Sequence, residues 1–254
     1  MKRLWAALGF LTLLPMPAAW LPTEEALEGS VPFFPLVGLL IGLSAVGIAA
    51  GFEGIFPPLV LAVILVVWLG VAHRGLHIDG LCDTADGLLS HRSREQILEI
   101  MHDSRVGVFG CLAILSTSLL KITALASLSP DQRMKAVLLA PLAGRCAMVP
   151  LLDFLPYIRQ EGLAAPFCRG RAAWETWVAI AALLATAWLL AHWAGVTASA
   201  VTLAVLALLA IGYKTKLGGI TGDTLGAASE IAETLVLIVL CAQPLSALWG
   251  QGAG

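Results

Sequence analysis

The chain has 254 residues, of which 59% are hydrophobic and 13% are charged, and its formal net charge is -2. A mean hydropathy of +0.89 lies outside the range of soluble domains and indicates an integral membrane protein. The small net charge gives no support for a nucleic-acid-binding surface. The five cysteines are scattered without a Cys-x-x-Cys pair, so the sequence indicates neither a structural zinc site nor a disulfide framework.

The first apolar run occupies residues 4–20 and is interrupted by Pro15 and Pro17. It offers about ten residues of continuous apolar helix, whereas a bilayer crossing needs about 20. We therefore expect a short N-terminal interfacial or re-entrant helix. A secretory signal peptide is the competing interpretation, because Lys2 and Arg3 precede the apolar run and small residues follow it.

Further along the chain, apolar stretches approach the length of transmembrane helices. They cover residues 31–51, 56–73, 109–128, 136–155, 176–193, 196–213 and 232–250. The predicted fold class is all-α: a polytopic helical bundle of about seven transmembrane helices plus the short N-terminal helix. We expect residues 1–254 to form a single membrane-embedded domain.

Basic residues predict the orientation, since short cytoplasmic loops are enriched in lysine and arginine. With the N-terminus inside and the first helix not crossing, three basic loops share the cytoplasmic face; they contain Arg74, Arg92, Arg94, Arg105, Arg159, Arg169, Arg171, Lys214 and Lys216. Arg133 and Lys135 are the exception and fall outside. Four spans separate the polar segments 73–107 and 213–233, so both are predicted on this face. We expect a bacterial inner (cytoplasmic) membrane location.

Three aspartates stand close together in the first polar segment. If the chain after Val71 continues as helix, Asp79, Asp83 and Asp86 occupy positions i, i+4 and i+7 on one stripe. Like charges so close repel one another, which favours a bound divalent cation, and oxygen ligands favour Mg²⁺ or Mn²⁺. Asp103 would complete the site by folding back. The alternative is a row of solvated carboxylates paired with nearby arginines.

The second polar segment contains "GGITGDTLGA", residues 218–227, after Lys214 and Lys216. Glycines and hydroxyls at a helix start suit the close approach of a phosphate. A flexible connector with a helix cap at Thr221 or Asp223 explains the stretch about as well. Glu230 and Glu233 follow where the last span is predicted to begin, and their simplest interpretation is a pair of carboxylates at a helix N-terminus.

Two stretches together resemble the signature regions of the cobalamin synthase family, the adenosylcobinamide-GDP ribazoletransferases: "HIDGLCDTADGLLSHRSREQILEIMHDSRVGVFG" and "GGITGDTLGAASEIAE". The similarity extends to "GFLTLLPMP" and "VPFFPLVGLLIG" near the start. The resemblance implies an integral membrane enzyme that requires Mg²⁺. It would join α-ribazole, or its 5′-phosphate, to adenosylcobinamide-GDP with release of GMP.

On this basis we assign expected roles to the polar residues. The expected metal ligands are Asp79, Asp83, Asp86 and Asp103, with Asp103 or Asp79 instead accepting the ribose hydroxyl proton. His77 would assist proton transfer, although a hydrogen-bonded bystander is the more common role of such a histidine. The expected phosphate and substrate contacts are Arg105, Lys214, Lys216, Gly219, Thr221, Gly222, Asp223 and Glu230.

Two other functions are weighed. Asp83-Thr-Ala-Asp86-Gly87 is similar to the opening of the CDP-alcohol phosphotransferase motif, but that pattern does not continue at Ser90-His91-Arg92. A cation-coupled transporter would place its carboxylates near the bilayer midplane, whereas these acids gather at one face. The lipid bilayer is an expected partner, and homo-oligomerisation is left open.

Overall fold

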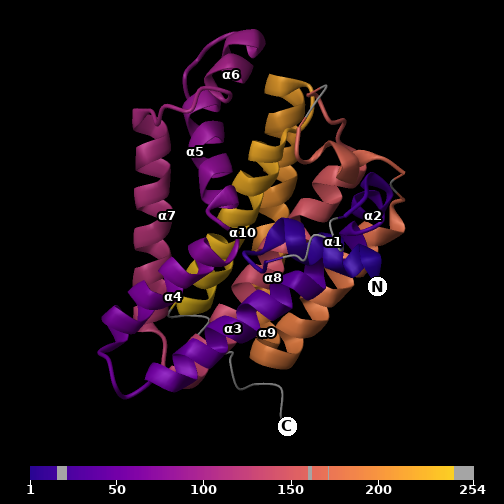
Figure 1. The fold of residues 1–254 in the computed structure, drawn as a ribbon. Coiled ribbons are helices and arrows are strands. Elements are labelled where there is room, and N and C mark those ends of the chain that lie inside the picture. The colour runs from indigo at the N-terminus through magenta and orange to yellow at the C-terminus, as the bar shows by residue number, and fades with distance from the viewer. Residues whose placement is uncertain (16–21, 160–161, 171, 243–254) are drawn as a thin grey trace.

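The structure is a computed structural model that describes residues 1–15, 22–159, 162–170 and 172–242. Its helices are α1 (Lys2–Leu11), α2 (Glu24–Glu28), α3 (Phe34–Phe52), α4 (Pro58–Ala72), α5 (Leu76–Leu88), α6 (Arg94–Ile100), α7 (Val108–Ser127), α8 (Pro130–Phe154), α9 (Trp174–Leu217) and α10 (Gly222–Cys241). Short 3₁₀ helices cover Val31–Phe33 and Ala165–Cys168. The described residues contain no strand, so the predicted all-α class is confirmed (Figure 1).

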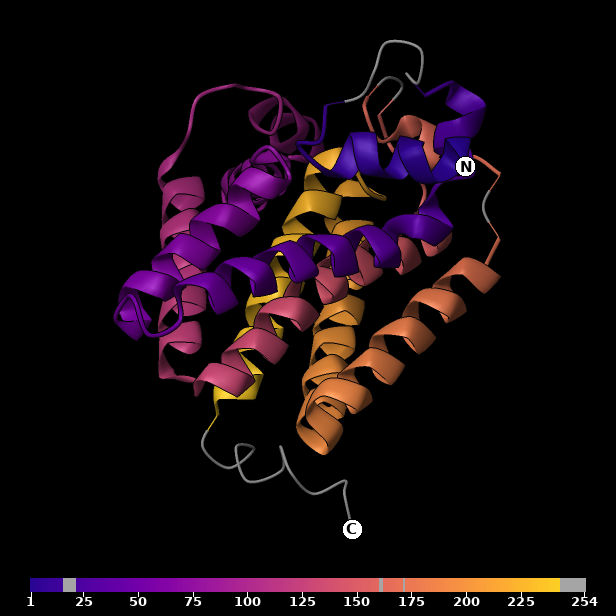
Figure 2. The same ribbon diagram turned by 60° about the horizontal axis from the view of Figure 1, so that its bottom comes forward.

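Helix α8 is the core of the bundle and packs against α3, α9 and α10 (Figures 1 and 2). Val137, Ala140 and Ala143 are fully buried along it. The outer helices instead expose large apolar side chains, such as Leu43, Leu119 and Leu189. In water such a surface would be costly, whereas hydrocarbon accepts it. The packing is therefore that of a bundle surrounded by lipid.

Five helices are long and apolar enough to cross a membrane, namely α3, α7, α8, α9 and α10. Helix α9 has 44 residues, but its helical geometry breaks at Ala191 and His192. A Cβ added at Gly195 would lie 2.2 Å from the carbonyl oxygen of Ala187, so the chain reverses there (Figure 2). Its two arms match the predicted spans 176–193 and 196–213. With α4 and both arms counted, the chain makes about the seven apolar passes predicted.

The expectation of continuous helix after Val71 is wrong. Helix α4 ends at Ala72, and α5 leaves it at an angle of 88°. Arg74 and Gly75 form the elbow with φ values of 57° and 72°, in the left-handed region that glycine tolerates best. The three aspartates therefore lie on a separate helix that crosses the direction of α4.

The last helix begins ten residues before its predicted start at 232. Thr221 and Thr224 form a capping box that starts α10 at Gly222. Glu230 and Glu233 consequently lie in the middle of α10, and their interpretation as carboxylates at a helix start is wrong. The predicted end of this span, residues 243–250, lies outside the described residues.

Helix α1 has ten residues, about 15 Å of helix, against about 30 Å of hydrocarbon. Ala6, Ala7 and Leu11 are buried against the rest of the protein, and Lys2 and Arg3 are exposed. This agrees with a short helix that does not cross. The end of its apolar run, residues 16–20, and the basic residue Arg171 lie outside the described residues.

Two basic residues in the first turns of α8, Arg133 and Lys135, are each neutralised by a carboxylate of the protein. The Arg133 guanidinium lies 2.8 Å from the Glu53 carboxylate and donates to the carbonyls of Leu125 and Leu128. Lys135 pairs with Asp131 one turn earlier on α8. These pairs explain why the two cations depart from the charge rule, since each is balanced by a nearby carboxylate.

We predict that Arg133→Ala is far more destabilising than Lys135→Ala. Removing Arg133 strands the Glu53 carboxylate and two carbonyls, which costs about 3 kcal/mol, whereas an exposed helical ion pair contributes about 0.3–0.5 kcal/mol. Thermal unfolding in detergent should show an apparent Tm lower by roughly 5–10 °C for the first variant. Equal shifts for both variants would contradict this account of the α7–α8 connection.

Candidate active site

Helices α5 and α10 pack against each other at two glycines. A Cβ added at Gly80 would lie 2.7 Å from the carbonyl oxygen of Asp223. A Cβ added at Gly226 would lie 3.1 Å from the Cα of His77. The absence of side chains at both positions lets the backbones approach closely. The two polar segments, far apart in sequence, therefore lie side by side.

The three aspartates of α5 have different surroundings. Asp79 is exposed, while Asp83 and Asp86 are partly buried. The Asp86 carboxylate accepts hydrogen bonds from the backbone N–H groups of Gly107, at 2.7 Å, and Gly110, at 2.9 Å. These groups lie in the first turn of α7, where helix donors lack intrahelical partners. Asp86 thus caps α7 from a neighbouring helix, a contact that the sequence pattern does not reveal.

Asp223 joins the aspartates from the α10 side. Its carboxylate lies 2.7 Å from the guanidinium of Arg159, which also donates to the carbonyl of Met101. The charges that act on Asp83 are those of Asp79, Asp86 and Asp223, opposed by Arg159. Carboxylates therefore outnumber the cation at this place. Arg159 was not among the predicted site residues, because its basic loop gave no hint of this partner.

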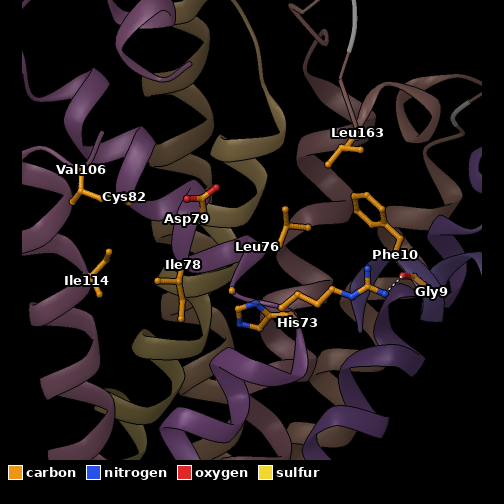
Figure 3. A pocket seen from close by; sticks show the side chains of 12 residues that line it. Gly9, Phe10, His73, Leu76, Ile78, Asp79, Cys82, Val106, Ile114 and Leu163 are labelled. Atoms are coloured by element: carbon orange, nitrogen blue, oxygen red, sulfur yellow. Dashed lines mark hydrogen bonds between the residues drawn. The ribbon is translucent and has the colours of Figure 1, made fainter. Parts of the chain in front are cut away.

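A cavity of about 570 Å³ opens beside Asp79. Val106 and Ile114 bound one side, and Phe10 and Leu163 bound the other, with Asp79 between them (Figure 3). Its inner part reaches His73 at the α4–α5 elbow. The site thus combines a carboxylate with mostly apolar walls, an arrangement typical of small-molecule clefts.

The donor set is suitable for Mg²⁺. Asp79, Asp83 and Asp223 offer carboxylate oxygens, and Mg²⁺ typically takes one or two carboxylates together with water and substrate phosphates. In the described chain, the ligand atoms that converge within 4.8 Å belong to His73, His77 and Glu230 instead. The aspartates therefore form an open site that suits an ion shared with a phosphate.

Asp103 and Arg105 form their own pair at the surface. Both carboxylate oxygens of Asp103 accept from the Arg105 Nε, at 3.0 and 2.9 Å. These hydrogen bonds lower the pKa of Asp103 to about 2. Among the described residues, the side chain of Asp103 forms hydrogen bonds and an ion pair with Arg105, and none with α5. The contacts of Asp103 in this structure therefore give no support to its predicted role as a metal ligand or as a base.

The glycine-rich connector is fixed by backbone contacts. A Cβ at Gly219 would lie 2.1 Å from the carbonyl oxygen of Pro156. The Ile220 N–H donates to the same carbonyl at 2.9 Å, and the Ile220 carbonyl accepts from Ile158 at 3.0 Å. Thr221 caps α10, whose first residue is Gly222. The geometry is that of a capped connector, the second of the two interpretations of this stretch.

The two lysines at the end of α9 differ in their contacts. Lys216 donates to the carbonyl of Leu88 at 3.4 Å, next to the C-terminus of α5. Lys214 is exposed and forms no ion pair with the described residues. Lys216 is therefore the lysine that lies beside the aspartate helix.

Beneath the surface site lies a buried charge network. The Lys121 ammonium on α7 lies 2.7 Å from Glu230 and 2.8 Å from Glu233. Arg145 on α8 pairs with Glu233, and His73 lies 3.2 Å from Glu230. All these side chains are at most 4% exposed. Glu230 is therefore part of an internal network, in contrast to its predicted substrate contact.

The sequence contains a signal of this network, namely basic residues inside predicted membrane spans. Lys121 and Arg145 interrupt two otherwise apolar predicted spans, 109–128 and 136–155. A charge inside a membrane span is costly and indicates a partner of opposite charge. The partners come from α10, more than 80 residues away, which no local pattern identifies.

His77 lies deeper than its predicted role in proton transfer implies. It is 1% exposed and stacks on His73 with ring centroids 4.5 Å apart. Neither of its ring nitrogens has a hydrogen-bond partner. It faces a second, smaller cavity that also contains Asp223.

A membrane bundle with clustered carboxylates, a neighbouring cation and an apolar cleft defines a polytopic protein that handles a charged small molecule. The family model for cobalamin-5-phosphate synthase matches residues 3–241, and the chain belongs to this family. The protein named adenosylcobinamide-GDP ribazoletransferase from Roseiflexus sp. (strain RS-1) is 44% identical over 92% of this chain and 87% of its own length.

Other relatives carry the same name. The protein from Citrobacter koseri is 38% identical, with 94% of this chain and 99% of the relative covered. The protein from Geotalea daltonii is 37% identical, with 95% and 98% covered. No solved structure gives a significant match to the chain. The resemblance in the two signature regions is thus confirmed at the level of the family.

We predict that Lys121→Met strongly destabilises the protein, because it leaves Glu230 and Glu233 short of a buried counter-charge. Removing one partner of a buried pair costs about 3–5 kcal/mol. The double variant Lys121→Met with Glu230→Gln should lose less stability than the single variant, since it removes the surplus charge. Thermal unfolding in detergent measures both. A double variant that is less stable than the single one would contradict the network.

Proposed function

We propose that this protein is an adenosylcobinamide-GDP ribazoletransferase, which joins adenosylcobinamide-GDP and α-ribazole, or its 5′-phosphate, and releases GMP in the last steps of vitamin B12 biosynthesis. The observation that carries the proposal is the close packing of α5 against α10. Because of this packing, Asp79 and Asp83 of one signature region lie near Asp223 of the other, which supports a shared site. The names of the relatives supply the substrates.

In this reaction a ribose hydroxyl oxygen of α-ribazole bonds to the phosphorus that carries the cobinamide. The bond from that phosphorus to the bridging oxygen breaks, GMP leaves, and the hydroxyl proton passes to a base. Asp79 is the carboxylate that lines the larger cavity, so we assign the proton to it. Arg74 lines the same cavity, and Arg159 pairs with Asp223 beside it, so these two cations are candidates for binding the phosphates.

We also propose that the enzyme depends on Mg²⁺. Asp83 and Asp223 would hold the ion, which leaves Asp79 to accept the proton. When bound, it would neutralise the phosphate oxygens, whose charge shifts toward the leaving group during the transfer. The excess of carboxylates over Arg159 supports this assignment, because a divalent cation relieves their repulsion.

We predict that Asp83→Asn strongly slows GMP release while leaving the unfolding temperature nearly unchanged. Asp83 would contribute charge to the ion, and one such charged contact is worth about 30- to 1000-fold in rate. Asp86→Asn is the matched variant and should lower both activity and stability, since Asp86 also caps α7. Full turnover of Asp83→Asn at limiting Mg²⁺ would overturn the metal assignment.

The same assay separates this function from a CDP-alcohol phosphotransferase. Purified protein should release GMP from adenosylcobinamide-GDP and no CMP from a CDP-alcohol. Release of CMP would support the lipid synthase. Release of neither, together with cation uptake into vesicles, would support the transporter.

We propose that the aspartate helix faces the cytoplasm of a bacterial inner membrane. In a variant without the native cysteines, Arg92→Cys and Thr215→Cys should both react with an impermeant thiol reagent only after the cells are opened. Ile55→Cys, in the connection between α3 and α4, should react in intact cells. Labelling of Arg92→Cys and Thr215→Cys from different sides would overturn the composite site.

A further inference from the structure

The smaller cavity, of about 110 Å³, lies where α5, α8 and α10 meet. Its walls are aromatic on one side: the Phe167 ring lies 4.5 Å from Phe10 and 5.5 Å from Phe34, between centroids. Met148 and Leu152 on α8 close the apolar part. A water-sized group occupies about 10–15 Å³ of such space, so the cavity admits roughly seven to eleven of them, the scale of a bicyclic aromatic ring.

The polar side chains that line this cavity are His77, Tyr157, Arg159 and Asp223. His77 is almost fully buried, and neither of its ring nitrogens has a hydrogen-bond partner among the described residues. Arg159 and Asp223 form an ion pair next to the α5 aspartates. A buried nitrogen without a hydrogen bond is costly, and a ligand atom at hydrogen-bond distance would remove that cost.

We propose that this cavity binds the benzimidazole base of α-ribazole, with His77 donating a hydrogen bond to the free ring nitrogen. The proposal rests on the proposed function and adds a place for the acceptor substrate. The base is flat, bicyclic and apolar apart from that one acceptor nitrogen, which matches aromatic walls with a single imidazole. The attached ribose then extends toward Asp223 and the aspartates, where its hydroxyl reacts.

Guanine, the other flat heterocycle in the reaction, does not match this cavity. Its edge carries several donors and acceptors, and each would need a partner once buried. Away from the ion pair, the side chains of the described lining offer the His77 imidazole and the Tyr157 hydroxyl. A pocket that leaves several polar atoms unpaired rejects such a ligand strongly. The larger cavity beside Asp79 has room for the guanosine diphosphate part of the donor.

The decisive experiment compares α-ribazole with its indole analogue, in which a C–H group replaces the free ring nitrogen. Equilibrium dialysis with the purified protein, without donor, gives the Kd of each. We expect the indole analogue to bind the wild-type protein about 10- to 100-fold more weakly, because it lacks the acceptor for His77. Equal affinities would overturn the proposal.

His77→Leu should bring the two affinities within about twofold of each other, because the variant lacks the hydrogen-bond donor of the imidazole. Ile114→Phe is the control in the larger cavity and should keep the wild-type ratio. Detergent gel filtration checks that each variant is folded, and the wild-type comparison stands even where His77→Leu is not. An unchanged ratio in folded His77→Leu would overturn the assignment of the hydrogen bond.

Competition with GMP separates the two heterocycles. GMP should leave α-ribazole binding to the wild-type protein unchanged, whereas competitive displacement of α-ribazole by GMP would place guanine in the smaller cavity and overturn the proposal. Failure of the wild-type protein to release GMP from both substrates would instead overturn the proposed function. The ratio of the two Kd values from dialysis still tests the proposed site of the base in that case, because the measurement requires no turnover.

Discussion

The contact between α5 and α10 at Gly80 and Gly226 is the constraint on which the site depends. Both signature regions are short helical segments, and neither alone collects enough groups to hold a phosphate and a metal ion. With a side chain at either glycine, the helices would separate by the width of that side chain. The carboxylates of Asp83 and Asp223 would then lie farther apart and act on each other more weakly.

Two acidic helices repel each other when they pack together. The protein compensates this repulsion in one way inside the bundle and in another at the surface. Within the bundle, Lys121 and Arg145 balance Glu230 and Glu233, so the network is neutral in charge. At the surface, Arg159 faces several aspartates and leaves negative charge uncompensated. A balanced buried cluster serves the packing of helices, whereas an unbalanced exposed one is suited to bind a cation.

Local sequence patterns predict much of this arrangement, but not all of it. Apolar runs predicted the spans well, because hydrocarbon thickness sets their length. The elbow at Arg74–Gly75 depends on an unusual backbone conformation, and the early start of α10 depends on a threonine cap. A hydropathy pattern contains neither of these features. The α7 cap by Asp86 and the salt bridges of Lys121 join residues from different helices. Such contacts follow only from the packing, which no single stretch specifies.

The buried network also bears on why this chemistry is performed within a membrane bundle. The larger cavity extends from Asp79 down to His73, which contacts Glu230. Its walls come from α7 and from the region of α1, where Ile114 and Phe10 contribute apolar side chains. Apolar walls lower the local dielectric constant even beside an open cavity, so an ion and a phosphate near Asp79 would attract each other more than on a flat polar surface. The apolar helices then contribute to the electrostatics of the site as well as to its insertion in the bilayer.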